Sequence, residues 1–259
     1  MRSRIASLQN LTIKNLVKLR RRSARDRQKL MLIDGERALR LAMLNNVKIE
    51  SIFFKEEAGS SDLLEETAGK KILLQPVSND VFSKISYGGS PDHFIGLASQ
   101  PEFSLQNMSQ PENAIYLVAE GIEKPGNLGA ILRSADAAGV TGLLLCNSRT
   151  DIYNPNVIRA SRGAFFSVPI ADTTSEAALI WLKDNDIHIY AASPYAELLY
   201  TKADFTGPSA IAIGAEHEGL SAPWLKEDIV KIPMKGQIDS LNVAQSASIL
   251  IFEALRQRL

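Results

Sequence analysis

Three segments of this 259-residue chain place glycines and polar side chains directly after a short apolar run. The first carries Asn127 and Arg133, the second Glu216, and the third Ser240 and Asn242. Side chains of these types can orient a substrate and stabilise charge that develops on an oxygen atom. Because ligands of open parallel sheets bind at the carboxyl ends of the strands, we expect the three segments to form one cleft.

Two of these segments also have an ordinary structural interpretation. Asn127 could cap a helix from outside, with Arg133 on the helix surface. Inside one helix, a spacing of six residues is about 600° of rotation, so the two side chains would not lie one above the other. Ser240 is well placed as the N-cap of the last helix. The spacing alone leaves these alternatives open.

The second segment, 214–221, does not match either of two common nucleotide-binding loops. It has two glycines, which would let a ligand approach the backbone closely, and acids where a triphosphate-binding loop has lysine. Its glycine spacing and its late position in the chain do not fit a dinucleotide fingerprint. An acidic loop of this kind would tolerate a cation such as a sulfonium.

Taken together, the segments resemble the three ordered motifs of the SpoU (TrmH-like) RNA ribose 2′-O-methyltransferases of the SPOUT class. The matching residues are Asn127-x-Gly129-x-x-x-Arg133, Gly214-x-Glu216-x-x-Gly219-Leu220-Ser221 and Ile232-Pro233-Met234-x-Gly236-x-x-x-Ser240-Leu241-Asn242-Val243. The stretch from Asn154 to Ala164 resembles the family segment between the first two motifs. The run Asp34-Gly-Glu-Arg37 resembles the substrate-binding domain of many members, although the family more often has Glu where Asp34 stands.

The resemblance implies an α/β fold in which a small ribosomal-protein-like α/β domain precedes a parallel-sheet domain with a deep trefoil knot. We expect an RNA substrate-binding domain at 1–105, a linker at 106–113 and the knotted methyltransferase domain at 114–259. The knot loops would bind S-adenosyl-L-methionine. A homodimer through the knotted domain would bring Arg133 of one subunit to the cofactor of the other.

The resemblance also assigns roles to individual residues. We expect no metal ion in the site. The implied catalytic residues are Arg133, Asn127, Glu216, Ser240 and Asn242. The implied cofactor-binding residues are Gly214, Gly219, Ile232, Met234, Gly236 and Leu241. The expected RNA-binding residues are Lys18, Arg20, Arg21, Arg22, Arg25, Arg159 and Ser161. An arginine holds its proton near neutral pH and is a poor base, so we interpret Arg133 as an electrostatic clamp. His217 lies at a variable position of the motif and is expected in a solvated loop.

The N-terminal segment is strongly basic although the formal net charge of the chain is zero. Ten Lys or Arg residues and one acid, Asp26, lie between Arg2 and Lys29. Such a segment could be a solvated helix face or an organelle transit peptide. We favour contact with an RNA phosphate backbone.

Composition predicts a soluble protein, and we expect it in the cytoplasm. Apolar residues make up 45% of the chain, but no run approaches the length of a membrane span, and no secretory signal is evident. The single cysteine, Cys146, lies in an apolar run and is expected in a buried strand. The three histidines lack metal-ligand spacing, which argues against a metalloenzyme.

The alternation of apolar and polar residues predicts two α/β regions. In the first we expect strands at 30–33, 49–54, 71–74 and 94–98 and helices at 34–45, 62–68 and 79–85. In the second we expect strands at 114–119, 142–145, 187–191, 210–213 and 229–232 and helices at 128–138, 156–162, 175–184 and 241–259. Such alternation is typical of a largely parallel sheet covered by helices.

The extra N-terminal domain favours ribosomal RNA, with guanosine the commonest family target, over transfer RNA as the substrate. A tRNA 2′-O-methyltransferase remains an alternative. Two other classes are a non-catalytic RNA-binding or ribosome-assembly factor and, less well supported by the loops, a Rossmann-type oxidoreductase.

Overall fold

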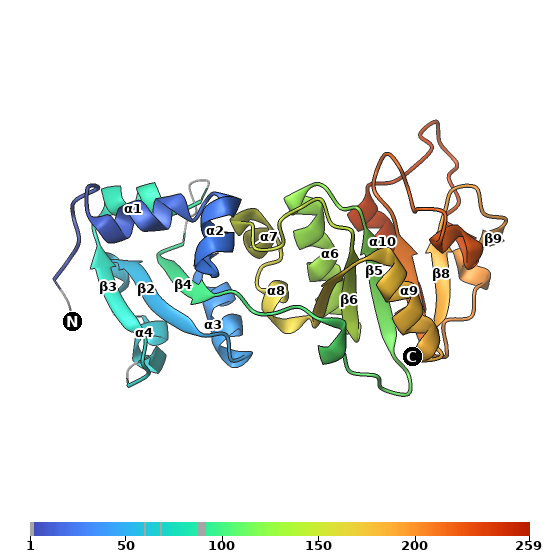
Figure 1. Ribbon diagram of the computed structural model, residues 1–259, viewed down its shortest axis with the longest axis horizontal. Helices are drawn as coiled ribbons and strands as arrows, with labels where there is room; N and C mark the ends of the chain where they lie inside the picture. The colour runs from blue at the N-terminus through green and yellow to red at the C-terminus, as the bar shows by residue number, and fades with distance from the viewer. Residues whose placement is uncertain (1–2, 60, 68, 88–91) are drawn as a thin grey trace. The chain divides into compact units, whose positions relative to one another are not determined.

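The structure is a computed structural model that describes residues 3–59, 61–67, 69–87 and 92–259. The chain forms two compact units (Figure 1). Unit 1 contains residues 1–101 and 151–167, and unit 2 contains residues 102–150 and 168–259. Within the described ranges, no helix has the length and apolar character needed to cross a membrane.

Unit 1 is built on a four-stranded sheet with the order β1-β4-β2-β3. Strand β4 is antiparallel to β1 and β2, whereas β2 and β3 are parallel. The strands are β1 (Leu30–Asp34), β2 (Ile49–Lys55), β3 (Leu73–Val77) and β4 (Phe94–Ser99). The helices are α1 (Leu11–Lys18), α2 (Arg22–Gln28), α3 (Glu36–Leu44), α4 (Asp62–Thr67), α5 (Asn79–Ile85), α7 (Pro155–Ala160) and α8 (Ala164–Ser167), with a 3-10 turn η1 (Glu56–Ala58). Residue 68, the last of one expected helix, lies outside the described residues.

The core of unit 1 forms where α1 and α5 cover the sheet. Asn10 caps α1 by accepting a hydrogen bond from the Thr12 amide at 2.9 Å, which leaves the apolar face of the helix free to pack. The buried cluster contains Ile13, Leu16, Leu19, Ala24, Leu32, Phe53, Val77, Val81, Phe82, Ile85, Ile95 and Leu97. Several of the apolar residues of the basic N-terminal segment are therefore buried in the core, while many of its cations lie on the surface.

Arg25 of α2 belongs to the buried half of that segment. Its side chain is 1% exposed, and its guanidinium donates to the Leu19 carbonyl at 2.6 Å and forms an ion pair with Asp151. The expectation that Arg25 contacts RNA is wrong for this structure, because Asp151, far along the sequence, already occupies its guanidinium. The neighbouring Arg27 is exposed.

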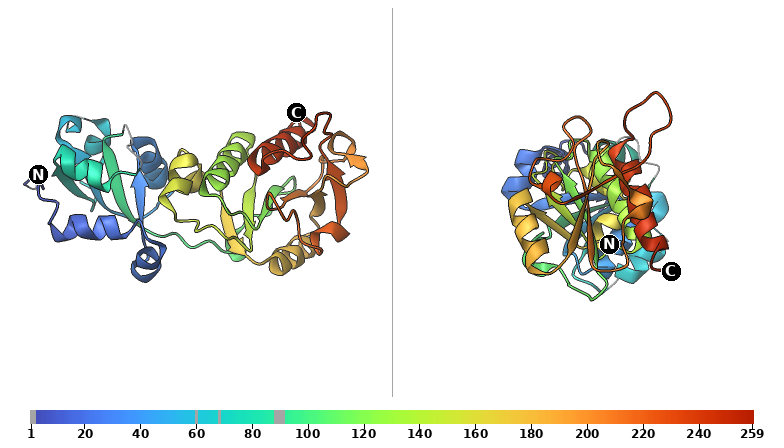
Figure 2. Two further views of the ribbon diagram at one scale, coloured as in Figure 1. Left: turned by 90° about the horizontal axis from the view of Figure 1, so that it is seen from above. Right: turned by 90° about the vertical axis from the view of Figure 1, so that its right-hand side faces the viewer.

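Unit 2 is built on a seven-stranded, fully parallel sheet with the order β7-β6-β5-β10-β8-β11-β9. The strands are β5 (Ile115–Glu120), β6 (Gly142–Cys146), β7 (Ile170–Thr173), β8 (His188–Ala192), β9 (Leu198–Leu199), β10 (Ser209–Ile213) and β11 (Asp228–Lys231). Helices α6 (Pro125–Ala138) and α10 (Val243–Arg256) cover one face of the sheet, and α9 (Ser175–Asp184) covers the other (Figure 2). Three 3-10 turns complete the unit: η2 (Leu105–Asn107), η3 (Tyr200–Lys202) and η4 (Trp224–Lys226).

The predicted parallel sheet is confirmed, and each of its five expected strands is present within two residues of the expected bounds. Strands β7 and β9 were not expected, because one is short and partly polar and the other has two residues. Cys146 is buried in β6 as expected, and its burial raises the pKa of the thiol. The trefoil knot stays a prediction.

We predict that Arg25→Ala lowers the free energy of unfolding by about 3 kcal/mol, because it leaves the Asp151 carboxylate buried without its cation. The exposed neighbour provides the control, since Arg27→Ala should change stability by less than about 0.5 kcal/mol. Urea unfolding of the two variants measures the difference. Equal, small effects of both substitutions would mean that the ion pair contributes nothing.

Candidate active site

The carboxyl ends of β5, β10 and β11 lie at one edge of the unit 2 sheet, since all its strands are parallel and β5 is paired with β10. Each of the three strands is followed by one of the motif segments. The topology therefore brings the three segments to the same edge, as expected from the sequence.

A single carboxylate joins the three segments. Glu216 accepts hydrogen bonds from the side-chain amides of Asn127 at 2.9 Å and Asn242 at 2.7 Å, and it forms an ion pair with Lys124. Asn242 also donates to the Asn127 side-chain oxygen at 3.2 Å. The bond from Lys124, followed by that from Asn127, lowers the pKa of Glu216. The structure thus brings together one predicted residue from each motif.

The negative charge of the second segment is already paired within the chain. Lys124 neutralises Glu216, and Arg149 forms an ion pair with Glu218 at 2.5 Å. We expected this acidic loop to tolerate a cation such as a sulfonium, and its two acids already have cationic partners within the chain. These acids instead hold the loop against the segments that follow β5 and β6.

Asn127 lies in the first turn of α6 and not outside it. The helix begins at Pro125, whose ring is suited to a first helical position, and Lys124 occupies the cap position without a side-chain bond. The cap interpretation of Asn127 was therefore wrong. Arg133 lies in the same helix, exposed, about 9 Å further along the axis. Within the described residues no ion-pair partner of Arg133 is found.

The last helix is capped by Asn242 and not by Ser240. The Asn242 side-chain oxygen accepts a hydrogen bond from the Ala244 amide at 3.0 Å, because α10 begins at Val243. Asn242 thereby uses its oxygen for the helix and its nitrogen for Glu216. Ser240 is exposed in the preceding loop, so the structure does not bring it into the cluster.

The glycines of the second segment serve the chain itself. A Cβ atom on Gly214 would lie 2.1 Å from the carbonyl carbon of Gly219, so only glycine fits there. Ala215 and Gly219 form a β-bridge, with the Gly219 amide donating to the Ala215 carbonyl at 2.9 Å and Gly219 at φ 69°. What approaches the Gly214 backbone is the other end of the loop, whereas we expected a ligand there.

The remaining predicted cofactor residues lie between β11 and α10. Ile232, Met234 and Leu241 are half-buried, and Gly236 is exposed. No backbone hydrogen bond of Met234 or Leu241 to another described residue is present. This loop therefore offers apolar side chains together with unused backbone donors and acceptors.

Sequence reasoning missed Glu120, the last residue of β5. Its carboxylate is 5% exposed and accepts hydrogen bonds from the amide and the hydroxyl of Ser221, both at 2.7 Å, and from the hydroxyl of Ser175. The only signal in the sequence is a carboxylate at the end of an apolar strand. Its partners are far away along the chain.

The predicted RNA-binding residues separate into exposed and structural groups. Lys18, Arg21 and Arg22 are exposed in or beside α1 and α2. Arg20 donates to the Lys84 carbonyl at 2.7 Å and to that of Ser86.

Two further residues that we expected at the RNA lie in or beside α7. Arg159 donates to the Tyr87 carbonyl at 2.6 Å. Ser161 is 1% exposed and bonded to the carbonyl of Ile158, so the expectation that it contacts RNA is wrong for this structure. Its hydroxyl also accepts from the Phe165 amide and so holds the turn from α7 to α8.

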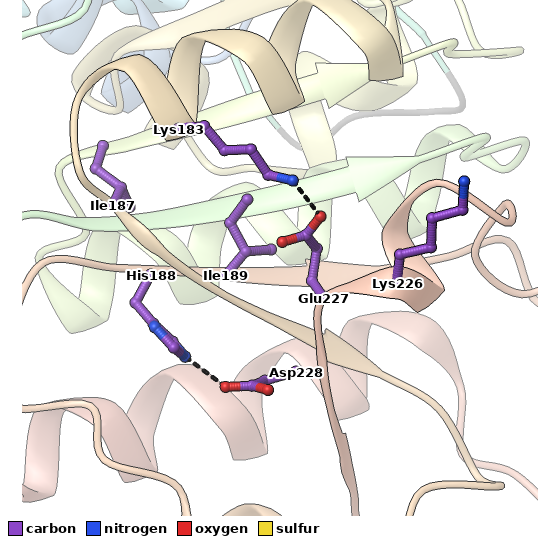
Figure 3. Close-up of a pocket in the computed structure, with 7 residues that line it drawn as sticks. All are labelled: Lys183, Ile187, His188, Ile189, Lys226, Glu227 and Asp228. Carbon is purple, nitrogen blue, oxygen red and sulfur yellow. Dashed lines mark hydrogen bonds and ion pairs between the residues drawn. The ribbon is translucent and has the colours of Figure 1, made fainter.

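A separate groove lies at the amino ends of β8 and β11 (Figure 3). Four of its polar side chains are paired with one another, Lys183 with Glu227 at 2.6 Å and His188 with Asp228 at 2.8 Å. Ligands of parallel sheets bind at the opposite edge. This groove is therefore not our candidate site. Elsewhere among the described residues, no group of His, Cys, Asp and Glu is suited to hold a metal ion.

The fold and the cluster define a parallel α/β domain whose polar residues meet at the carboxyl ends of its strands. Residues 114–252 match the SpoU rRNA Methylase family, and residues 10–96 match the MRM3-like substrate binding domain. The chain belongs to the SpoU rRNA Methylase family.

Two curated relatives are similar over nearly the whole chain. The 23S rRNA (guanosine(2553)-2'-O)-methyltransferase RlmP of Bacillus subtilis is 28% identical over 96% of this chain and 97% of its own. The 23S rRNA (uridine(2479)-2'-O)-methyltransferase of Streptomyces viridochromogenes is 28% identical over 92% of this chain and 86% of its own.

Two solved structures share the fold over both units. A crystal structure of an RNA 2'-O ribose methyltransferase is 42% identical, covers 99% of each chain and has a TM-score of 0.87. An AdoMet-bound rRNA methyltransferase from Sinorhizobium meliloti is 27% identical, covers 99% of this chain and 98% of its own, and has a TM-score of 0.91.

We predict that Gly214→Ala destabilises unit 2 by about 2 kcal/mol, because the new Cβ displaces the Gly219 backbone. Gly207→Ala is the control, since a Cβ there meets open space. Urea unfolding compares the two variants. If Gly214→Ala is as stable as the control, the loop does not close as described.

Proposed function

We propose that this chain transfers the methyl group of S-adenosyl-L-methionine to a ribose 2′-hydroxyl of ribosomal RNA. The observation that carries the proposal is the cluster of Asn127, Glu216 and Asn242, which joins all three family motifs at one edge of the sheet. The relatives support the reaction, because they are named 23S rRNA 2'-O-methyltransferases.

The loop before α10 fits such a cofactor. The half-buried side chains of Ile232, Met234 and Leu241 offer an apolar surface for an adenine ring. Unused backbone groups of Met234 and Leu241 can satisfy the polar atoms of a nucleoside. The AdoMet-bound neighbour from Sinorhizobium meliloti supports this assignment.

The cofactor supplies an electrophilic methyl group, and the side chains of the chain have to position the acceptor hydroxyl. Arg133 is exposed and charged, so it can bind the phosphate beside the target ribose with its planar fork and stabilise the alkoxide that develops. A guanidinium keeps its proton near neutral pH, so the hydroxyl proton leaves to phosphate or water. Glu216 is held by Lys124 and by the side-chain amides of Asn127 and Asn242, and it thereby fixes the loop 214–221.

A homodimer through unit 2 completes this proposal. Arg133 lies further along α6 from Asn127, and within one subunit it is not part of the cluster. In a dimer, Arg133 of one subunit serves the cofactor bound by the other. Ser240 is exposed in the loop before α10, and its proposed role is to help orient Arg133 and the target ribose.

The RNA-binding surface is proposed on the exposed cations of α1 and α2. Lys18, Arg21 and Arg22 remain available to phosphates, whereas Arg25 does not. The match of residues 10–96 to a substrate binding domain supports this placement. Ribosomal RNA of the 23S type is the proposed substrate, guanosine the proposed nucleoside and the cytoplasm the proposed location.

Transfer of tritium from labelled S-adenosyl-L-methionine to total RNA of a strain that lacks this protein tests the function. We expect label at one nucleotide of 23S-type rRNA, mapped by ribose-methylation sequencing. Label in transfer RNA instead would correct the substrate. Measurable cofactor binding without label in any RNA would favour a non-catalytic RNA-binding factor.

Arg133→Lys tests the proposed clamp in the same assay. The substitution keeps the charge but loses the bidentate fork, so we expect most of the activity to disappear. Cofactor affinity, measured by calorimetric titration, should be retained and serves as the control for folding. Near-normal turnover would overturn the bidentate contact with phosphate.

A further inference from the structure

Glu120 is a buried carboxylate without a cationic partner among the described residues. Its hydrogen bonds come from neutral groups, namely the Ser221 amide, the Ser221 hydroxyl and the Ser175 hydroxyl. Ser175 is the first residue of α9, so the positive end of a ten-residue helix faces the carboxylate. Neutral donors and the start of a helix therefore satisfy this carboxylate without a cation.

The network around Glu120 joins four segments at the carboxyl edge of the sheet. Glu120 ends β5, Asn147 follows β6, Ser175 follows β7, and Ser221 ends the loop that follows β10. The Asn147 amide donates to the Ser175 oxygen at 2.9 Å, and Ser175 in turn donates to Glu120. The network therefore contacts the second motif at its last residue, Ser221.

The ion pairs that hold this loop are at least partly exposed to solvent. The side chain of Lys124 is 63% exposed in its pair with Glu216, and those of Arg149 and Glu218 are 50% and 63% exposed. Exposed ion pairs contribute little and are screened by salt. Hydrogen bonds to a buried carboxylate contribute more. The Glu120–Ser221 contact is therefore a tether of the loop that starts from a buried carboxylate.

We propose that Glu120 is a positioning residue that holds residues 214–221 in the conformation in which Glu216 meets Asn127 and Asn242. Two bonds to Ser221 fix both the backbone and the side chain at the end of the loop. The inference rests on the proposed function, because its consequence is a loop already formed for S-adenosyl-L-methionine. Glu120 itself contacts none of the three residues of the cluster through a hydrogen bond.

Glu120→Gln tests this role, because the amide has one acceptor oxygen in place of two and no charge, so it cannot accept both the Ser221 N–H bond and the two hydroxyl bonds. We expect the dissociation constant for S-adenosyl-L-methionine and the KM for this cofactor to rise about tenfold, the equivalent of one charge-assisted hydrogen bond. The kcat at saturating cofactor should stay within about threefold of the wild type, because Glu120 touches no reacting atom. Calorimetric titration and initial rates measure the two quantities.

A control variant has to show that a loss of stability alone does not weaken cofactor binding. Cys146 is the register partner of Glu120 on β6 and is buried, and its side chain bonds only to the Leu144 carbonyl among the described residues, so Cys146→Ala lowers stability and leaves the Glu120–Ser221 bonds in place. This control should bind the cofactor as the wild type does. Ser221→Ala removes one of the two bonds at an exposed residue and should weaken binding, whereas Ser221→Thr keeps the hydroxyl and should restore it.

The outcomes separate this inference from the proposed function. If the wild type does not bind S-adenosyl-L-methionine, the proposed function fails. If the wild type binds it, and both Glu120→Gln and Ser221→Ala bind equally well, the positioning role of Glu120 is overturned. If Glu120→Gln does not fold, the pair Ser221→Ala and Ser221→Thr decides in the same way.

Discussion

The Glu216 carboxylate holds together three segments that are up to 115 residues apart in sequence. A carboxylate has several acceptor positions, and here two amides and one ammonium group use them. This is possible only because the strands of unit 2 are all parallel, so that β5, β10 and β11 end at one edge. The sheet determines where the loops begin, and Glu216 determines how they meet.

Glu216 and Glu120 have different surroundings and therefore different roles. Glu216 is half-buried and paired with Lys124, so it remains close to solvent and to the proposed substrate. Glu120 is buried and is satisfied by hydroxyls, an amide and the start of α9. The half-buried Glu216 joins the three segments of the site, and the buried Glu120 holds the end of the loop at Ser221. Glu216 belongs to one of the three family motifs, whereas Glu120 lies outside all three.

Much of the architecture could be predicted, because runs of four to six apolar residues between polar loops define buried strands. The helix 79–85 was placed to the residue, since Ser78 caps it. The role of Arg25 could not be predicted, because its sequence surroundings match those of Arg27 and only distant Asp151 distinguishes them. Ser240 was mistaken for a cap because Asn242, two residues later, is an equally good one. These errors concern choices between chemically similar neighbours.

Amide hydrogen exchange with and without S-adenosyl-L-methionine tests the central claim most directly, because it reports where the cofactor binds without requiring the RNA. The account predicts slower exchange in three ranges, 120–128, 213–221 and 232–243, and unchanged exchange around the groove of His188 and Asp228. Protection at that groove, or no protection at the carboxyl edge despite saturating cofactor, would contradict the account.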